Sequence, residues 1–233
     1  DDLSGALDSP AEFAALCGPV PLALEGPPLA AMDSATREAP RAEAAARAAA
    51  LAPHLAGADL AFKKVDSLLR GHVALELAAC WATGAFRHLV LAPAFPAQGR
   101  VTRAGRVLSR QGAGWQPHGD LGALLRAEGL RATLHDPLAP LPDGVSVLDA
   151  ETEDDLARIA ALGATARGPV LWAGSGGLAR ALAAAAPVAF DRALAAPVLG
   201  CFGSDRAETA AQLAACGPAH LVVAAGDAPR VAA

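Results

Sequence analysis

The stretch DLAFKKVDSLLRGH, residues 59–72, joins an apolar, strand-like segment to a dense polar turn and to the start of a helix. Residues 59–64 predict a strand and residues 72–83 predict the helix that follows it. Because side chains alternate between the two faces of a strand, Lys64 and Asp66 are expected on one face. A strand followed directly by a helix is the repeating unit of a parallel α/β sheet.

The rest of the chain continues this alternation of short apolar strands with helices, which indicates crossover units. We therefore predict an α/β protein: a parallel-sheet domain with helices on both faces at residues 1–190, then the start of a second α/β domain at residues 191–233. Residues 93–105 are predicted as a loop, and the pattern is less regular from there as far as Trp115. Further strands are predicted at residues 21–24, 88–92, 130–135, 145–148, 170–173, 198–202 and 220–224. Further helices are predicted at residues 6–17, 41–51, 121–128, 154–162, 177–186 and 207–216.

Composition and charge exclude several classes of protein. The 233 residues are 53% hydrophobic and 18% charged, so the chain can bury a core and is not disordered. The net charge of −5, without a basic stripe, argues against a nucleic-acid partner. No signal peptide and no uninterrupted apolar run of membrane-spanning length occurs. The four cysteines lack metal-site spacing and favour buried free thiols, so we predict a cytoplasmic protein with no metal ligands of its own.

The chain contains only two lysines, Lys63 and Lys64, among 19 basic residues. Lysine is a compact point charge, whereas arginine is a planar fork, so the pair is expected where a point charge is required. Lys64, Asp66 and Arg70 lie within seven residues and suit a small polyhydroxylated acid, because cations hold a carboxylate and an aspartate accepts from hydroxyls. Alternatively, Asp66 or Ser67 only caps the next helix, which leaves the lysines and Arg70 unexplained.

Other polar clusters are expected at the same edge of the sheet, because ligands bind outside the carboxyl ends of parallel strands. Arg100 ends a proline-stiffened loop, which is either part of a site or an ordinary rigid connection. Asp1 and Asp2 precede a glycine turn, where they bind hydroxyls or a cation, or simply cap the first helix. Arg37 lies among small hydroxyl residues. Gly174 and Ser175 open a glycine-rich turn, which is either a phosphate cradle or a site of tight helix packing.

Six short motifs occur in a fixed order along the chain. They are DDLSG at residues 1–5, DSATR at 33–37, KKVDSLLRG at 63–71, APAFPAQGR at 92–100, DAETEDDL at 149–156 and GSGGLA at 174–179. Together they resemble the four-carbon acid sugar kinase family, formerly a domain of unknown function. In that family a threonine stands at the position of Ser4, and the segment that corresponds to residues 33–37 reads Asp-Thr-Glu-Ser-Arg. The resemblance covers nearly the whole chain.

The resemblance implies an acid-sugar-binding domain at residues 1–190 and the beginning of a nucleotide-binding domain at residues 191–233. The implied reaction is in-line transfer of phosphate from ATP, with Mg²⁺, to a hydroxyl of threonate, erythronate or a 3-oxo-tetronate. Asp66 is the candidate base, and Lys63 is a candidate to stabilise the transferred charge. The residues assigned to the acid sugar are Asp2, Arg37, Lys64, Asp66, Ser67, Arg70 and Arg100. Those assigned to the nucleotide are Gly174, Ser175, Gly203 and Ser204.

Two departures from the family are visible. The family's first strand, before the Asp-Asp pair, and most of its nucleotide domain are not matched, so we expect the chain to be part of a longer polypeptide. No Walker A lysine loop is present. One alternative is therefore a non-catalytic acid-sugar-binding protein without a functional nucleotide site. Another is an aldolase or dehydratase that uses a lysine as a Schiff-base nucleophile. A homodimer is also predicted as a candidate assembly.

Overall fold

The computed structural model describes residues 2–18, 20–23, 31–184, 207–215 and 217. The chain divides into two compact units, Asp1–Phe190 and Asp191–Ala233. The described part of the second unit is essentially the helix α7 (Ala207–Ala215). The strands predicted at residues 198–202 and 220–224 lie outside the described residues. No helix in the described ranges is both long enough and apolar enough to cross a membrane.

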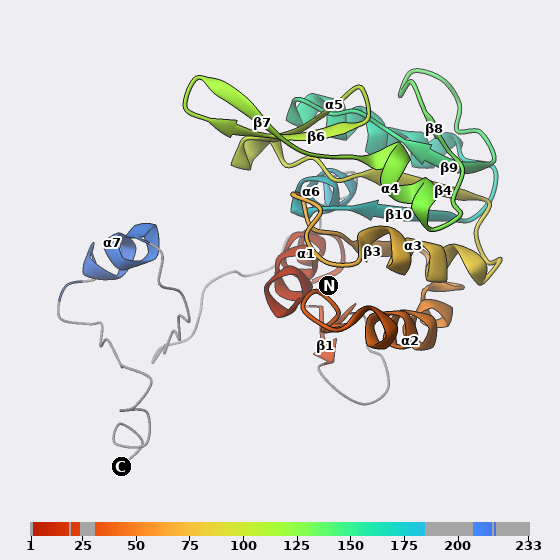
Figure 1. The fold of residues 1–233 in the computed structure, drawn as a ribbon, viewed down its shortest axis with the longest axis horizontal. Helices are drawn as coiled ribbons and strands as arrows, with labels where there is room; N and C mark the ends of the chain where they lie inside the picture. Colours follow the sequence, from red (N-terminus) through yellow and green to blue (C-terminus); the bar gives the residue numbers. More distant parts are fainter. Residues whose placement is uncertain (1, 19, 24–30, 185–206, 216, 218–233) are drawn as a thin grey trace, which may run out of the picture. The chain divides into compact units, whose positions relative to one another are not determined.

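The first unit is built on a five-stranded parallel sheet, which confirms the predicted α/β class (Figure 1). The strand order is β3-β10-β4-β9-β8, and each neighbouring pair is parallel. The strands are β3 (Ala61–Lys64), β4 (His88–Ala92), β8 (Ala132–Leu134), β9 (Gly144–Val147) and β10 (Val170–Gly174). A separate parallel pair joins β1 (Leu22–Ala23) and β2 (Ala31–Met32).

Helices cover both faces of the sheet, as predicted, because alternate strand residues point in opposite directions. Leu89 and Leu91 of the central strand β4 belong to the core formed with α3 and α4. Val90 and Ala92 belong to the core formed with α5 and α6. The helices are α1 (Leu3–Cys17), α2 (Arg41–Leu51), α3 (Val73–Ala82), α4 (Leu121–Ala127), α5 (Glu153–Ala161) and α6 (Gly176–Ala183), with short 3₁₀ turns η1 (Ala52–Leu55), η2 (Pro96–Gln98) and η3 (Leu162–Thr165).

The prediction of a loop and irregular chain after β4 is wrong from residue 100 onwards. Strands β5 (Arg100–Arg103), β6 (Arg106–Gln111) and β7 (Gly114–Asp120) form an antiparallel sheet, and Figure 1 shows the β6–β7 hairpin extending beyond the main sheet. The β5–β6 connection is Ala104 and Gly105, with φ of 49° and 71°. Two consecutive positive φ values are what a two-residue type I′ hairpin turn requires. Polar side chains along these strands hide the apolar alternation on which the prediction depended.

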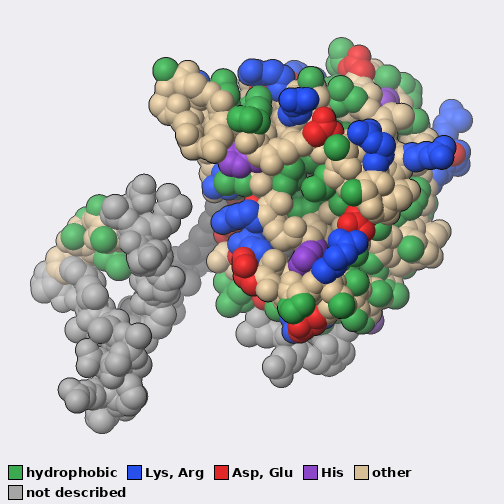
Figure 2. Space-filling view, viewed as in Figure 1, with side chains coloured by type: hydrophobic (Ala, Val, Ile, Leu, Met, Phe, Trp, Pro, Cys, Tyr) green, Lys and Arg blue, Asp and Glu red, His purple; other side chains and the backbone are tan. Residues whose placement is uncertain are grey.

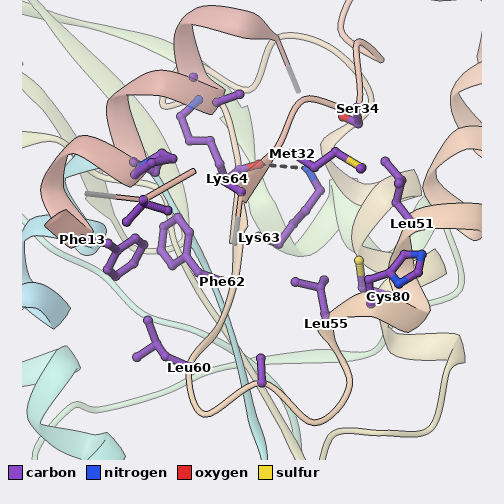
Figure 3. A pocket seen from close by; sticks show the side chains of 18 of the residues that line it. Phe13, Met32, Ser34, Leu51, Leu55, Leu60, Phe62, Lys63, Lys64 and Cys80 are labelled. Atoms are coloured by element: carbon purple, nitrogen blue, oxygen red, sulfur yellow. Dashed lines mark hydrogen bonds between the residues drawn. The ribbon is translucent and has the colours of Figure 1, made fainter. Parts of the chain in front are cut away.

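An apolar cavity of about 640 Å³ lies beside β3, between α1, β2, α2 and η1 (Figure 3). Its wall includes Phe13, Met32, Leu55 and Phe62. On the face of the molecule drawn in Figure 2, acidic and basic side chains are interspersed rather than gathered by sign. A second, smaller cavity at the end of β3 is lined mainly by polar and charged residues.

Candidate functional site

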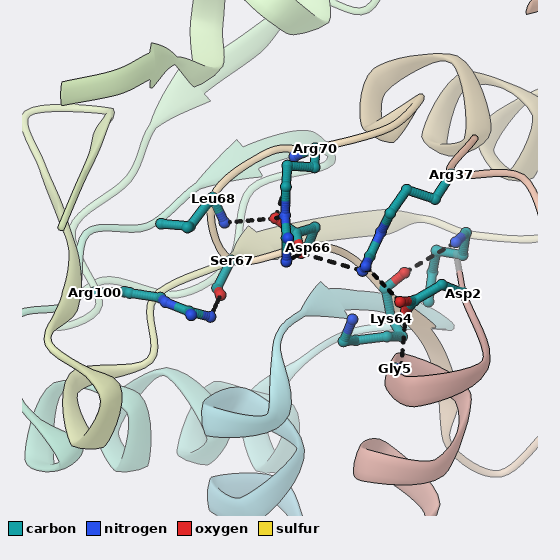
Figure 4. A network of polar contacts seen from close by, with 10 residues as sticks. Asp2, Gly5, Arg37, Lys64, Asp66, Ser67, Leu68, Arg70 and Arg100 are labelled. Atoms are coloured by element: carbon teal, nitrogen blue, oxygen red, sulfur yellow. Dashed lines mark hydrogen bonds and ion pairs between the residues drawn. The ribbon is translucent and has the colours of Figure 1, made fainter. Parts of the chain in front are cut away.

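A polar cavity of about 270 Å³ opens at the carboxyl ends of β3 and β10, the edge at which parallel sheets bind ligands. Its wall is formed by the starts of α1 and α6 and by the loops that follow β2, β3 and β4. The structure brings together all seven residues that the sequence assigns to the acid sugar (Figure 4). Gly203 and Ser204, assigned to the nucleotide, lie outside the described residues.

Asp66 is the centre of the polar network and is only 3% exposed. Its Oδ2 accepts hydrogen bonds from the Leu68 amide at 2.9 Å and from the amide and Nε of Arg70 at 3.2 and 3.1 Å. Its Oδ1 accepts from Arg70 Nη2 at 2.7 Å and from Arg37 Nη2 at 3.2 Å.

Burial alone would raise the pKa of Asp66, but the hydrogen bonds and charge of Arg70 and the Leu68 amide outweigh it and lower the pKa to about 2. The carboxylate is therefore a fixed anion that orients two guanidinium groups. A carboxylate with so low a pKa is a weak proton acceptor, so the geometry gives no support to the predicted role of Asp66 as a base.

Asp2 combines the two roles that the sequence left open. Its Oδ1 accepts from the Gly5 amide at 2.9 Å and so caps α1. Its Oδ2 forms an ion pair with Arg37 Nη1. Arg37, whose side chain is 14% exposed, therefore bridges Asp2 and Asp66 and fixes the start of α1 to the end of β3.

The two lysines diverge, which confirms the alternation predicted for the end of β3. Lys64 faces the polar cavity together with Asp66. Burial lowers the pKa of Lys64, and the nearby Asp66 and Asp2 offset part of that fall. Lys63 does not line the polar cavity; its ammonium pairs with the buried Glu76 and donates to the Lys64 carbonyl at 2.9 Å. The catalytic role assigned to Lys63 stays a prediction.

Arg100, the first residue of β5, reaches the cavity from the antiparallel sheet. Its Nη1 donates to Ser67 Oγ at 2.5 Å, and Ser67 is 4% exposed. The loop that follows β4 turns into β5 at Gly99, which has a left-handed φ of 66°. The rigid loop and the unpredicted strand together place this guanidinium beside the turn that follows β3.

The glycine-rich turn before α6 is explained by packing. A Cβ on Gly174 would lie 2.7 Å from the Ala92 carbonyl, and one on Gly177 would lie 2.8 Å from the Ala94 carbonyl. Ser175 is 1% exposed, donates to the Ala94 carbonyl at 2.7 Å and accepts from the Gly177 amide at 3.2 Å. These contacts fit the alternative of tight helix packing. The nucleotide role of Gly174 and Ser175 stays a prediction.

Asp8, on α1, lines the polar cavity and was not identified from the sequence. Burial raises the pKa of Asp8; Lys64 opposes that rise, and Asp2 and Glu12 add to it. Within the described ranges Asp8 forms no ion pair, whereas Asp2 and Asp66 are both held by arginine. The spacing of Asp8 four residues after Ser4, one helical turn, is the signal that would have placed both on the cavity side of α1.

Comparison with known proteins identifies relatives over most of the first unit. The family model of a sugar-binding N-terminal domain matches residues 1–121 and 107–182. A D-threonate kinase from Cupriavidus necator is 37% identical over 225 residues, which cover 79% of this chain and 52% of that enzyme.

Solved structures agree with that match. A domain of unknown function from Bordetella bronchiseptica, a domain-swapped dimer with bound citrate, has 28% identity and a TM-score of 0.63 over 78% of this chain and 54% of that one. A Haemophilus influenzae protein with 18% identity and a TM-score of 0.60 shares the fold over 79% of this chain and 54% of its own. The chain spans about half the length of the relatives it matches.

Proposed function

The chain belongs to the four-carbon acid sugar kinase family, and from this premise we propose that its polar cavity binds the acid sugar of an ATP-dependent kinase. The acceptor is a hydroxyl of threonate, erythronate or a 3-oxo-tetronate. The observation that carries the proposal is the convergence of four cations, Lys64, Arg37, Arg70 and Arg100, around one small cavity. Such a set suits a ligand that carries a carboxylate.

The size and charge of the cavity support a small anion. Its volume of about 270 Å³ is below the range of roughly 300–1,000 Å³ that accommodates drug-sized ligands. A ligand carboxylate beside Lys64 would favour the charged ammonium and so offset the effect of burial. The Arg70 side chain is 57% exposed although it is held by Asp66, so part of its guanidinium is accessible. The relative with bound citrate holds a hydroxylated carboxylic acid, which is consistent with this chemistry.

We assign activation of the attacking hydroxyl to Asp8 in place of Asp66. The oxygens of Asp66 already accept five hydrogen bonds, and its pKa is about 2. Asp8 faces the same cavity, its pKa is raised, and it forms no ion pair among the described residues. A carboxylate whose pKa is moved toward neutrality is the better proton acceptor. In this arrangement the cations hold the acid group while Asp8 orients and deprotonates the hydroxyl.

ATP supplies the transferred phosphoryl group, and Mg²⁺ neutralises charge on its phosphates. The described residues do not by themselves fit either group. Among them no cluster of three or more His, Cys, Asp or Glu side chains could hold a metal ion. The glycines before α6 are accounted for by packing. A homodimer also stays a prediction, although the Bordetella relative is a domain-swapped dimer.

We expect the full-length protein to release ADP when it is supplied with ATP, Mg²⁺ and at least one of D-threonate, D-erythronate or a 3-oxo-tetronate. A coupled ADP assay across the tetronate stereoisomers, with calorimetry on the same ligands, measures turnover and binding separately. Binding of a tetronate without ADP release would support the non-catalytic acid-sugar-binding alternative. Neither binding nor turnover with any of these acids would overturn the proposal.

Gly71→Ala is expected to weaken binding of the acid about 10-fold, because the change displaces Arg37. Gly71 has a left-handed φ of 80°, and a Cβ there would lie 3.1 Å from the Arg37 Cα. The backbone strain alone should lower the free energy of unfolding by about 1–2 kcal/mol. Gly57→Ala is the matched control, because Gly57 has a φ of 79° and nothing within 4 Å of the added Cβ. Equal loss of affinity in both variants would contradict the proposed role of the Gly71–Arg37 approach.

A further inference from the structure

Three polar side chains form a buried chain of contacts that the proposed reaction does not use. Glu76, in the first turn of α3, is 2% exposed. Its Oε1 accepts a hydrogen bond from Thr36 Oγ1 at 2.7 Å, and its Oε2 pairs with the ammonium of Lys63. Thr36 is fully buried. We call Lys63, Glu76 and Thr36 the buried relay.

Each end of the buried relay is attached to a residue of the polar cavity. Lys63 donates to the carbonyl of Lys64, and Figure 3 shows this bond at the edge of the apolar cavity. Thr36 directly precedes Arg37, and its Oγ1 lies 2.8 Å from Ser34 Oγ. The relay therefore joins β3, α3 and the loop after β2. β3 carries Lys64 and the loop after β2 carries Arg37, which are two of the four cations that line the cavity.

Stability is a weak explanation for this arrangement. Burial would raise the pKa of Glu76, but the charge and hydrogen bond of Lys63 and the hydrogen bond of Thr36 outweigh it and lower the pKa. The pair is thus ionised in surroundings that include the core residues Val73 and Leu77 of the same helix. Replacing a buried ion pair with well-packed apolar side chains is often neutral or stabilising. Its geometry, by contrast, fixes the backbone on both sides of the cavity.

We propose that Glu76 is a positioning residue, which acts through Thr36 to hold Arg37 and through Lys63 to hold the end of β3 at Lys64. This inference rests on the proposed acid-sugar site. Arg37 bridges Asp2 and Asp66, so a shift of its loop changes both of those contacts. Glu76 itself does not line the polar cavity.

The test is a double-variant cycle on the full-length protein with D-threonate as the probe, followed by calorimetry. Glu76→Gln is expected to raise the Kd about 10-fold, because small displacements of binding groups are costly. In an Arg37→Ala background the same change is expected to raise the Kd by a smaller factor, because only the path through Lys63 to Lys64 then remains. Asp143→Asn is the control, since it breaks the exposed Arg87–Asp143 pair, remote from the cavity, and should leave the Kd unchanged.

Two further variants keep the test decisive if Glu76→Gln folds poorly. Thr36→Val removes only the hydroxyl contact, and the double change Lys63→Met with Glu76→Leu replaces the ion pair with apolar side chains. Both are expected to fold and to bind D-threonate several-fold more weakly. Binding equal to wild type in these two variants, or independent effects of Glu76→Gln and Arg37→Ala, would overturn the positioning role alone. Absence of binding by the wild-type protein to any tetronate would instead overturn the proposed function on which it rests.

Discussion

Asp66→Ala is expected to lower the affinity for the acid sugar at least about 100-fold, because truncating one member of a buried charged pair costs several kcal/mol. The change removes the common partner of Arg70 and Arg37. Arg37 would remain largely buried and would keep its ion pair with Asp2. We expect the free energy of unfolding to fall by about 3 kcal/mol. Calorimetry with D-threonate and denaturant titration measure the two effects.

Asp66→Asn removes the charge of this side chain but keeps its shape, so it tests the contribution of the charge alone. The pKa of the carboxyl is about 2 in the folded protein, below its ordinary value of 3.8. Because the folded pKa is depressed, its contribution is present above about pH 4 and is lost as the pH falls toward about 2, at most about 2.5 kcal/mol. The wild-type protein should therefore lose more unfolding free energy than Asp66→Asn over this interval. Equal losses of unfolding free energy in the two proteins as the pH falls would contradict the assignment of a depressed pKa to Asp66.

Asp155 provides a matched control for both measurements. The pKa of Asp155 is also about 2, since hydrogen bonds to its carboxylate outweigh the effect of burial. It belongs to the capping box of α5 and does not line the polar cavity. Asp155→Asn should reduce the acid-dependent loss of stability but leave the affinity for D-threonate unchanged. A loss of affinity in this variant would indicate that helix stability, rather than the cavity, governs binding.

The parts of the fold and site that could be predicted are those set by local periodicity. The strands of the five-stranded sheet and the described helices have bounds within three residues of those expected, whereas the short strand β2 was not predicted. Alternation along β3 was enough to separate Lys63 from Lys64 and to place Lys64 with Asp66. The order of the motifs then predicted that Asp2, Arg37 and Arg100 lie near Lys64 and Asp66, because ligands bind at the edge of the sheet where parallel strands end.

The parts that could not be predicted depend on contacts between distant segments. The turn between β5 and β6 places Ala104 at a positive φ, a conformation that alanine rarely adopts and that its presence in the sequence does not predict. The hydrogen bond between Thr36 and Glu76 joins residues that are 40 positions apart. Nothing in the sequence of α3 indicates that Glu76, the single buried acid of this helix, faces the loop after β2. For the same reason, the hydrogen bond from Arg37 to Asp66, 29 residues apart, is visible only in the assembled site.

Asp8→Asn is expected to lower kcat by about 100-fold or more, in the range that loss of a general base produces. The change keeps the size of the side chain and removes its negative charge, and with it the capacity to accept a proton. Because Lys64, Arg37 and Arg70 are unaltered, the Kd for D-threonate should change less than about 3-fold. This separation of kcat from binding distinguishes Asp8 from Asp66, whose loss should abolish binding first.

Glu12→Gln is the matched control for Asp8→Asn, one helical turn further along α1. Glu12 pairs with Arg180 of α6 and does not line the polar cavity. Its charge adds to the raised pKa of Asp8, so Glu12→Gln should lower kcat far less than Asp8→Asn does. An equal fall in kcat in the two variants would assign the effect to the position of α1. Turnover by Asp8→Asn at the wild-type rate would exclude Asp8 as the base.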